Sequence, residues 1–385
     1  MIKISDKSLC CGCTACYAAC PADAIVMKPD VLGFKYPHVD MSKCIDCGLC
    51  EKVCNFRALE KGTDVKAYAV RHKDNSVVRK STSGAAFVAF SDYILEHGGV
   101  VYGAAFDGHF RVVHKRTASP EERDGLRKSK YVQSDMGDVF RQVRTDLKHG
   151  LTVLFTGTPC QTAGLRSYIG PNSSERLYLL DIVCHGVPSP RVWEEYVGWQ
   201  EKRKGEEAVS VEFRDKQFGW RSSWESFTFS SEKVVSKSYN YLFYKNIMLR
   251  QSCQTCPYAS VYRPSDITMA DYWRKDKTCP EFASDDMGCS LILCHSEKGR
   301  QLLAEVSHMV NMTSADLDAC LQLNLVQPSG SHPRRDDFER DFDLKGLEYV
   351  MRKYGDLGWR YRLKSMCKSI YQAVRQTARK LLGRR

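Results

Sequence analysis

The sequence predicts an α/β protein in which a small cysteine-rich α+β module precedes a larger α/β domain with a mostly parallel or mixed sheet. Eight cysteines form two similar runs within the first 60 residues. From about residue 64 to residue 325, apolar strand-like segments alternate with helix-like ones, as in α/β folds. A chain of 385 residues is also long enough for two or three domains. We therefore predict three parts, at residues 1–60, 64–325 and 335–385.

The expected elements follow from the alternation along the chain. The segment 83–98 has helical periodicity and ends at a glycine, and Ser189 with Pro190 is a typical helix start. The remaining helices are expected at residues 136–150, 161–169, 189–205 and the second half of 289–306. Strands are expected at 66–72, 99–106, 151–157, 176–186, 209–215, 226–232, 266–273 and the start of 289–306.

Composition limits the class of protein. Eighteen cysteines, with no apolar core of a secretion signal at the start of the sequence, indicate metal or cluster chemistry rather than a disulfide framework. No run of about 18 apolar residues occurs, so no membrane-spanning helix is expected. We predict a cytoplasmic location, with peripheral contact to the inner membrane surface as a further option.

The charge of the chain is concentrated at one end. Nine of the bases behind the net charge of +11 lie in residues 357–385, which hold no acid, so the rest of the chain is close to neutral. We therefore expect no nucleic-acid partner for the body of the protein. Apolar residues from Leu363 to Leu381 lie mostly on one helical face and predict a basic amphipathic helix. Such a helix suits an anionic membrane surface or a partner; the alternative is a packed terminal helix.

The cysteine repeat is the strongest motif. The first run reads C-x2-C-x2-C-x3-C-P and the second reads C-x2-C-x2-C-x3-C. Bacterial ferredoxins with two [4Fe-4S] clusters have this pattern, and the fourth cysteine of each run ligates the other cluster. The spacing predicts one ligand set of Cys10, Cys13, Cys16 and Cys54, and a second of Cys44, Cys47, Cys50 and Cys20. A pair of zinc sites is the alternative, and Cys11 is expected to be an additional thiol.

Four more cysteines suggest a third site. Cys160 and Cys184 each follow an apolar strand-like segment, and if these strands are parallel neighbours both emerge at the carboxyl edge of the sheet. Cys160 would also lie at a helix N-terminus, which stabilises anionic sulfur. Cys253 and Cys256 form a C-x2-C pair that can complete four thiolates, predicting a third [4Fe-4S] cluster. The alternative is four unrelated buried thiols.

Several motifs occur together in an informative order. The segments STSGAAFVAF, SKYVQSD, FTGTPCQTAGLR, DIVCHGVPSP and CQTCPYA followed by DITMADYW resemble the coenzyme F420-reducing hydrogenase/dehydrogenase β-subunit family over residues 64 to 310. A preceding ferredoxin module is a frequent fusion in that family. The resemblance implies an iron–sulfur flavoprotein that binds FAD. The sequence departs from the family pattern at Ala85 and Ala270, where glycine is usual.

The resemblance implies where FAD binds, since no G-x-G-x-x-G motif is present. A turn rich in hydroxyl groups before a helix can receive a pyrophosphate, although by itself it is only a good helix cap. A basic loop supplies a cation, and Lys130 is our candidate for the charge beside the flavin; a solvated basic loop is the alternative. His185 is a candidate proton relay or a neighbour of the cluster. The implied contacts are Ser81, Thr82, Ser83, Gly84, Ser129, Lys130, Tyr131, Gln133, Ser134, Thr156, Thr158 and Gln161.

These observations predict an iron–sulfur flavoprotein oxidoreductase. We expect it to pass electrons between [4Fe-4S] clusters and a flavin that exchanges hydride with coenzyme F420 or a similar organic partner. Ferredoxin or another electron-transfer protein is the expected redox partner. A ferredoxin-dependent reductase of another organic substrate, in an organism without coenzyme F420, remains open. So do a non-catalytic electron-transfer subunit and a zinc-binding interaction protein.

Overall fold

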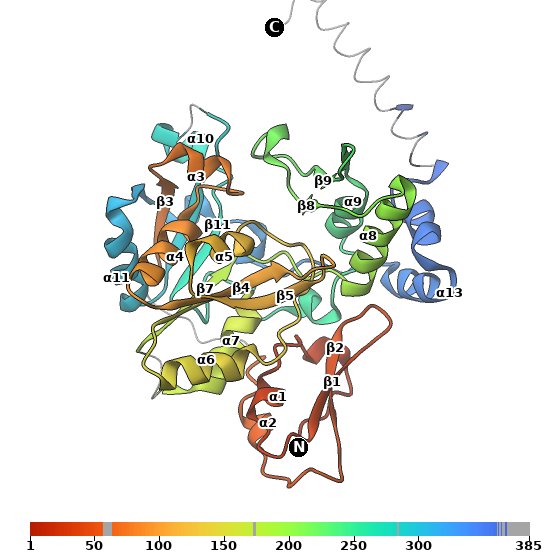
Figure 1. Cartoon of the computed structure of the whole chain (residues 1–385), viewed down its shortest axis with the longest axis horizontal. Helices are drawn as coiled ribbons and strands as arrows, with labels where there is room; N and C mark the ends of the chain where they lie inside the picture. Colours follow the sequence, from red (N-terminus) through yellow and green to blue (C-terminus); the bar gives the residue numbers. More distant parts are fainter. Residues whose placement is uncertain are drawn as a thin grey trace, which may run out of the picture.

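A mixed eight-stranded sheet forms the centre of the molecule (Figure 1). The structure is a computed structural model and describes residues 1–56, 64–171, 175–282, 285–359, 361, 363, 366 and 367. Four neighbouring strands, β11, β7, β6 and β4, run parallel, and the flanking pairs are antiparallel. In spatial order the strands are β13 (Val310–Ala315), β3 (Lys66–His72), β12 (Ser290–Cys294), β11 (Ile267–Asp271), β7 (Leu177–Ile182), β6 (Val153–Gly157), β4 (Val100–Phe106) and β5 (Val112–Thr117).

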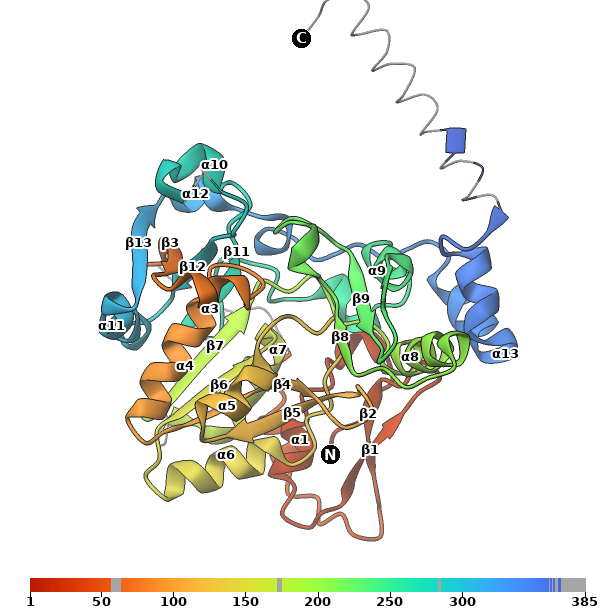
Figure 2. The same ribbon diagram turned by 45° about the horizontal axis from the view of Figure 1, so that its top comes forward.

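Helices cover both faces of this sheet, as predicted for an α/β fold (Figure 2). Alternate residues of one strand serve the two faces: Leu154 packs with α4 (Ala86–Glu96) and α11 (Glu297–Glu305), whereas Phe155 packs with α6 (Val139–Lys148) and α7 (Pro159–Ile169). The parallel strands are mostly apolar because both of their faces are buried, although β7 and β11 each contain an aspartate. Short helices complete this part: α3 (Asn75–Arg79), α5 (Pro120–Arg123), α10 (Lys275–Thr278) and α12 (Leu317–Cys320).

The segments predicted as strands at 209–215 and 226–232 do not join this sheet. They supply two strands of a separate antiparallel sheet in the order β10 (Lys233–Ser236), β9 (Glu225–Thr228), β8 (Ser210–Glu212), and its third strand, β10, was not predicted. Phe227 of the small sheet and Phe213, just after β8, pack against Trp193 of α8 (Pro190–Lys204), in a core that α9 (Ser238–Tyr244) and α13 (Arg335–Lys353) share. Ser189 caps α8 as predicted, since its hydroxyl accepts a hydrogen bond from the Val192 amide at 3.0 Å.

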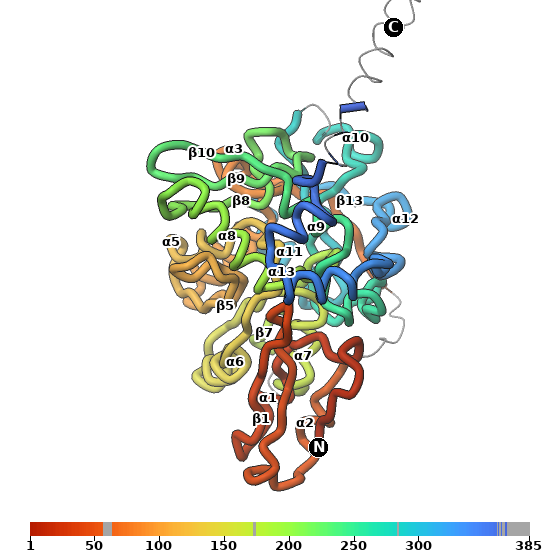
Figure 3. Tube along the Cα trace, turned by 90° about the vertical axis from the view of Figure 1, so that its right-hand side faces the viewer, coloured from red at the N-terminus to blue at the C-terminus, as the bar shows by residue number. Residues whose placement is uncertain are grey.

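The cysteine-rich module projects from one end of the molecule (Figure 3). It contains the hairpin of β1 (Ile25–Pro29) and β2 (Lys35–Val39) and the short helices α1 (Ala15–Ala19) and α2 (Leu49–Lys52). Its α1 packs on α6 and α7 through a shared apolar core. Gly164 of α7 permits this contact, because a Cβ there would lie 2.7 Å from Cys13 Sγ. The module is therefore fixed against the face of the main sheet that α7 covers.

Not every boundary between the three predicted parts of the chain lies within the described residues. The boundary at residues 60–64 falls partly on residues outside the described ranges, and so does most of the basic amphipathic helix predicted within 335–385. The division at 325–335 stays a prediction. Within the described ranges, no helix combines the length and apolarity that crossing a bilayer requires.

Candidate functional site: three cysteine sets beside a large cavity

The eight cysteines of the two runs lie around two separate cavities. Cys10, Cys13, Cys16 and Cys54 line one, and Cys20, Cys44, Cys47 and Cys50 line the other. These are the two crossed sets expected from the spacing, although their role as cluster ligands stays a prediction. Backbone amides already point at sulfur atoms in the second set, from Ile2 to Cys50 at 3.2 Å and from Ala24 to Cys20 at 3.3 Å. Such hydrogen bonds stabilise thiolates and suit a cluster.

The third cysteine set also converges. Cys160, Cys184, Cys253 and Cys256 line one cavity, and β6 and β7, which precede the first two, are parallel neighbours as the prediction required. Cys160 lies in the first turn of α7, where the Thr158 hydroxyl is 3.2 Å from its sulfur. The amide of Val187 donates to Cys253 Sγ at 3.4 Å. Four cysteines and two hydrogen-bonding groups therefore line one cavity, as a cluster site requires, although their role as ligands of a third cluster stays a prediction.

Burial governs the protonation of this third set. It raises the pKa of Cys253 to about 12 and that of Cys256 to about 11, and it raises the pKa of Cys184 as well. The pKa of Cys160 is lowered to about 7, first by a hydrogen bond from the Cys11 thiol and then by Thr158 and the charge of Arg250. Metal binding at this set must therefore release protons, and Cys160 is the readiest thiolate.

Cys11 lies between two of the sets. It is buried and lines the cavities of both the first and the third cysteine set, as do Cys160, Phe56 and Tyr258. The spacing identified Cys11 only as an additional thiol, because nothing in the sequence shows that α7 approaches this loop. Within the part of the chain that the structure describes, no three Cys, His, Asp or Glu side chains are close enough together to hold a single metal ion.

A large cavity of about 410 Å³ adjoins the third cysteine set. The two share the segment from Cys184 to Val187, together with Asn324. The large cavity lies at the carboxyl edge of the parallel strands, where open α/β sheets bind ligands. Eleven of the residues proposed from the sequence line it: Ser81, Thr82, Ser83, Ser129, Lys130, Tyr131, Ser134, Thr156, Thr158, Gln161 and His185.

Two predicted contacts do not line this cavity. Gly84 is packed against the sheet, since a Cβ there would lie 2.3 Å from the Val70 carbonyl oxygen and 2.6 Å from the Ser290 amide. The Gln133 side chain instead faces the cysteine-rich module, donating to the Cys11 carbonyl at 2.9 Å and accepting from Arg250 at 2.9 Å. A short loop presents alternate side chains to opposite sides, and the sequence does not reveal which side each one takes.

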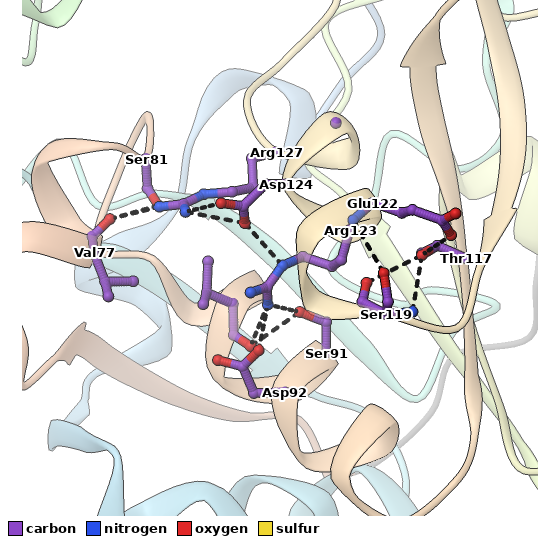
Figure 4. A network of polar contacts seen from close by, with 12 residues as sticks. Val77, Ser81, Ser91, Asp92, Thr117, Ser119, Glu122, Arg123, Asp124 and Arg127 are labelled. Atoms are coloured by element: carbon purple, nitrogen blue, oxygen red, sulfur yellow. Dashed lines mark hydrogen bonds and ion pairs between the residues drawn. The ribbon is translucent and has the colours of Figure 1, made fainter.

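The turn of residues 81–83 also differs from the expected helix cap. Helix α4 begins at Ala86, and the residue that precedes it, Ala85, has φ +66° and makes no side-chain cap. Because alanine has a Cβ, this left-handed conformation strains the backbone at Ala85. Two cations hold the turn: Arg127 donates to Ser81 Oγ at 2.9 Å (Figure 4), and Lys216 donates to the Ser81 and Ser83 carbonyl oxygens at 3.0 and 3.3 Å.

Lys130 is half-buried at the cavity wall. Its ammonium donates to the carbonyl oxygens of Gly125 at 2.9 Å and Arg127 at 2.7 Å. Burial, and then the nearby charge of Lys128, lowers the pKa of Lys130 to about 7. Its charge therefore changes near neutral pH, which suits a group that adjusts the electrostatics of a bound cofactor.

Two histidines line the cavity. His185 Nε2 lies 2.7 Å from Asn246 Oδ1 and packs edge-on against Phe243, and burial lowers the pKa of His185. His114 was not singled out from the sequence; its ring nitrogens lie 2.8 Å from Ser134 Oγ and 3.0 Å from the Thr156 carbonyl oxygen. Burial lowers the pKa of His114 to about 4, so it is neutral at pH 7 and anchors two candidate contacts.

The small sheet contributes a charged wall that the sequence did not predict. Arg214, just after β8, pairs with Asp271 of β11, and its guanidinium lies 5.1 Å from the centre of the Trp273 ring. All three residues line the cavity. No local motif marks Arg214, because its partner is distant in sequence and belongs to the other sheet.

Comparisons with known protein families agree with this two-part arrangement. A scan against such families matches residues 9–58 to "4Fe-4S dicluster domain" and residues 150–319 to the C-terminal part of "Coenzyme F420 hydrogenase/dehydrogenase, beta subunit". Among solved structures, a chain of the F420-reducing [NiFe] hydrogenase complex from Methanosarcina barkeri matches with 15% identity and a TM-score of 0.47, covering 78% of this chain and 97% of that one. No curated protein matched the chain.

The family matches confirm the resemblance seen in the motifs. They indicate an iron–sulfur oxidoreductase that transfers electrons. Residues 9–58 belong to the 4Fe-4S dicluster domains, and residues 150–319 belong to the coenzyme F420 hydrogenase/dehydrogenase beta-subunit family.

Proposed function

We propose that the protein is a flavin-dependent iron–sulfur oxidoreductase that connects an organic hydride donor or acceptor to one-electron carriers. One observation carries this proposal. The segment Cys184–Val187 is at once a wall of the large cavity and a wall of the third cysteine set. A cofactor in the cavity would therefore lie next to a cluster in that set, as conversion between two-electron and one-electron chemistry requires.

The charge of the cavity supports FAD as its occupant. Arg127, Lys128, Lys130 and Arg214 line it, whereas Asp271 is the one acidic residue among the described lining residues. Arg127 is buried, and its Nε has no hydrogen-bond partner within the described residues. A buried cation with a free donor at a turn of hydroxyl side chains is suited to a pyrophosphate. FAD, when bound, supplies hydride exchange and releases electrons one at a time.

The chain's own residues hold and shield such a cofactor. Ile182, Phe243 and Met269 supply apolar walls that exclude water. Because His185 is neutral at pH 7 and held by Asn246, one ring nitrogen can accept or return a proton at the cavity. Lys130 places a titratable charge at the wall of the same cavity.

The three cysteine sets form a series, which supports their proposed role as [4Fe-4S] ligands. Cys160 and Cys11 line both the third and the first cavity, and α1, which contains Cys16 of the first set, ends next to Cys20 of the second. When clusters are bound, single electrons can pass along this series. Cys47 of the second set is exposed, so a ferredoxin or another electron carrier can approach there.

Anaerobic purification of the full chain tests the proposal. We expect brown protein with iron for about three [4Fe-4S] clusters and one released FAD per chain. Flavin reduction by reduced coenzyme F420 would support that partner, whereas reduction only by reduced ferredoxin would indicate a reductase of another organic substrate. Iron without FAD would indicate a non-catalytic electron carrier. Colourless protein containing zinc would refute the proposal.

A further inference from the structure

Arg250 joins the first and third cysteine sets. It is fully buried and lies three residues before Cys253. Its side chain crosses to the cysteine-rich module, where Nε donates to the Cys10 carbonyl oxygen at 2.8 Å and Nη2 lies 3.6 Å from Cys10 Sγ. The same Nη2 donates to the Lys35 carbonyl oxygen at 3.0 Å. The guanidinium is therefore in contact with a predicted ligand of the first cluster.

The first cysteine loop packs closely on the guanidinium. Gly12, between Cys11 and Cys13, has φ +72°, and a Cβ there would lie 2.8 Å from Arg250 Nη1. Nη1 donates to Gln133 Oε1 at 2.9 Å, and Gln133 in turn holds the Cys11 carbonyl. The first cysteine loop is thus wrapped directly around the guanidinium.

The backbone of Arg250 belongs to the third set. Its amide donates to the Val187 carbonyl oxygen at 3.0 Å, and its carbonyl oxygen accepts from the Cys253 amide at 3.0 Å. Val187 donates in turn to Cys253 Sγ. One residue therefore ties the turn that carries Cys253 to the loop that carries Cys10.

The charge of Arg250 is not neutralised by a carboxylate. Its hydrogen-bond acceptors are two backbone carbonyls, an amide oxygen and a sulfur, and in the described ranges no acidic side chain forms an ion pair with it. Burying an unpaired cation is costly unless negative charge lies nearby. Four thiolates on a [4Fe-4S] core supply that charge, and hydrogen bonds and charges at the sulfurs determine the reduction potential of such clusters.

We propose that Arg250 is a positioning residue that raises the reduction potential of the Cys10/Cys13/Cys16/Cys54 cluster and holds this cluster in register with the third one. A fixed positive charge stabilises the reduced, more negative state of the cluster more than the oxidised state. This inference rests on the proposed cluster ligation and does not depend on whether FAD binds.

The test compares Arg250→Gln, Arg250→Lys and Arg335→Gln in the full-length protein with its clusters assembled anaerobically. Arg335 is the matched control because it is also buried and donates to the neighbouring Leu249 carbonyl at 3.0 Å, but its ion-pair partner is the Glu339 carboxylate rather than a cysteine. Iron per chain is measured first, and each cluster's potential is then followed by electron paramagnetic resonance during a redox titration. In Arg250→Gln we expect one cluster to become at least tenfold harder to reduce, a shift of about 59 mV for one electron.

Arg250→Lys keeps the charge and should recover most of that shift, whereas Arg335→Gln should leave all potentials unchanged. Full iron with unchanged potentials in Arg250→Gln would overturn the inference. Loss of a cluster in both Arg250 variants would also overturn it, since Arg250 would then be only a scaffold. If Arg250→Gln loses a cluster and Arg250→Lys keeps it, the positive charge at this position is what holds the cluster, and the inference stands. A wild-type chain without cluster iron would refute the cluster assignment itself, before any variant is compared.

Discussion

Arg127 donates a 2.9 Å hydrogen bond to the hydroxyl of Ser81 and so brings a buried cation to the turn that opens on the large cavity (Figure 4). Four residues earlier, Arg123 is equally buried and shares the Asp124 carboxylate with Arg127, each at 3.1 Å. Its other partners lie in α4, where it pairs with Asp92 at 2.7 Å and donates to Ser91 Oγ at 2.6 Å. The two arginines are therefore linked through Asp124, but of the two only Arg127 lines the cavity.

This pair gives a matched test of the FAD site. Arg127→Gln should lower FAD affinity by about 2 kcal/mol, or roughly thirtyfold, because a charge-assisted contact to the pyrophosphate is lost. Arg123→Gln should lower thermal stability but leave FAD affinity unchanged. The measurement is titration of the apoprotein with FAD by flavin fluorescence. Equal losses of affinity in both variants would show that Arg127 acts only through the fold.

The lowered pKa of Lys130, about 7, predicts a pH dependence of cofactor binding. Below pH 7 the ammonium is charged and attracts an anionic cofactor, and above pH 7 it becomes neutral. FAD should therefore bind more tightly at pH 6 than at pH 8, and Lys130→Met should flatten this dependence. Lys128→Met removes the neighbouring charge that helps to lower the pKa of Lys130, so it should move the pH dependence to higher pH rather than abolish it. An unchanged pH profile in Lys130→Met would contradict this role.

Substitution of single cysteines distinguishes ligands from core thiols. Cys184→Ala and Cys253→Ala should each lower iron by about one cluster while the two clusters of the cysteine-rich module persist. Cys294→Ala is the control, because Cys294 is fully buried in β12 and packs in the apolar core away from the three sets. It should cost some stability and no iron. Iron and acid-labile sulfide per chain decide the outcome, and full iron in Cys253→Ala would exclude it as a ligand.

The burial of His114 predicts a loss of stability in acid. Its folded pKa, about 4, lies below the ordinary value of 6.5, so the unfolded chain binds a proton at a higher pH than the folded chain does. Stability is therefore retained above pH 6.5 and falls as the pH drops toward 4, by about 3 kcal/mol for this group. His114→Gln should reduce that fall in denaturant unfolding of the apoprotein. His97→Gln, at an exposed position, should leave it unchanged.

Much of the main fold could be predicted because its elements carry strong local signals. The strands at 151–157 and 176–186 are mostly apolar on both faces, and Ser189 with Pro190 starts a helix by chemistry that needs no tertiary partner. The edge strands β5 and β13 were missed. Four consecutive residues of β13, from Asn311 to Ser314, are exposed, so it has no clean alternation of apolar and polar positions.

Spacing and composition along the chain are enough to specify the cysteine pattern, the order of the main alternating elements and the family. The folded structure was needed to show that the small sheet stands apart, that Gln133 turns away from the large cavity, and that Arg250 reaches from the third cysteine set to the first. The physical reason is that side-chain direction and contacts between distant segments depend on packing, which leaves no periodic trace in the residues themselves.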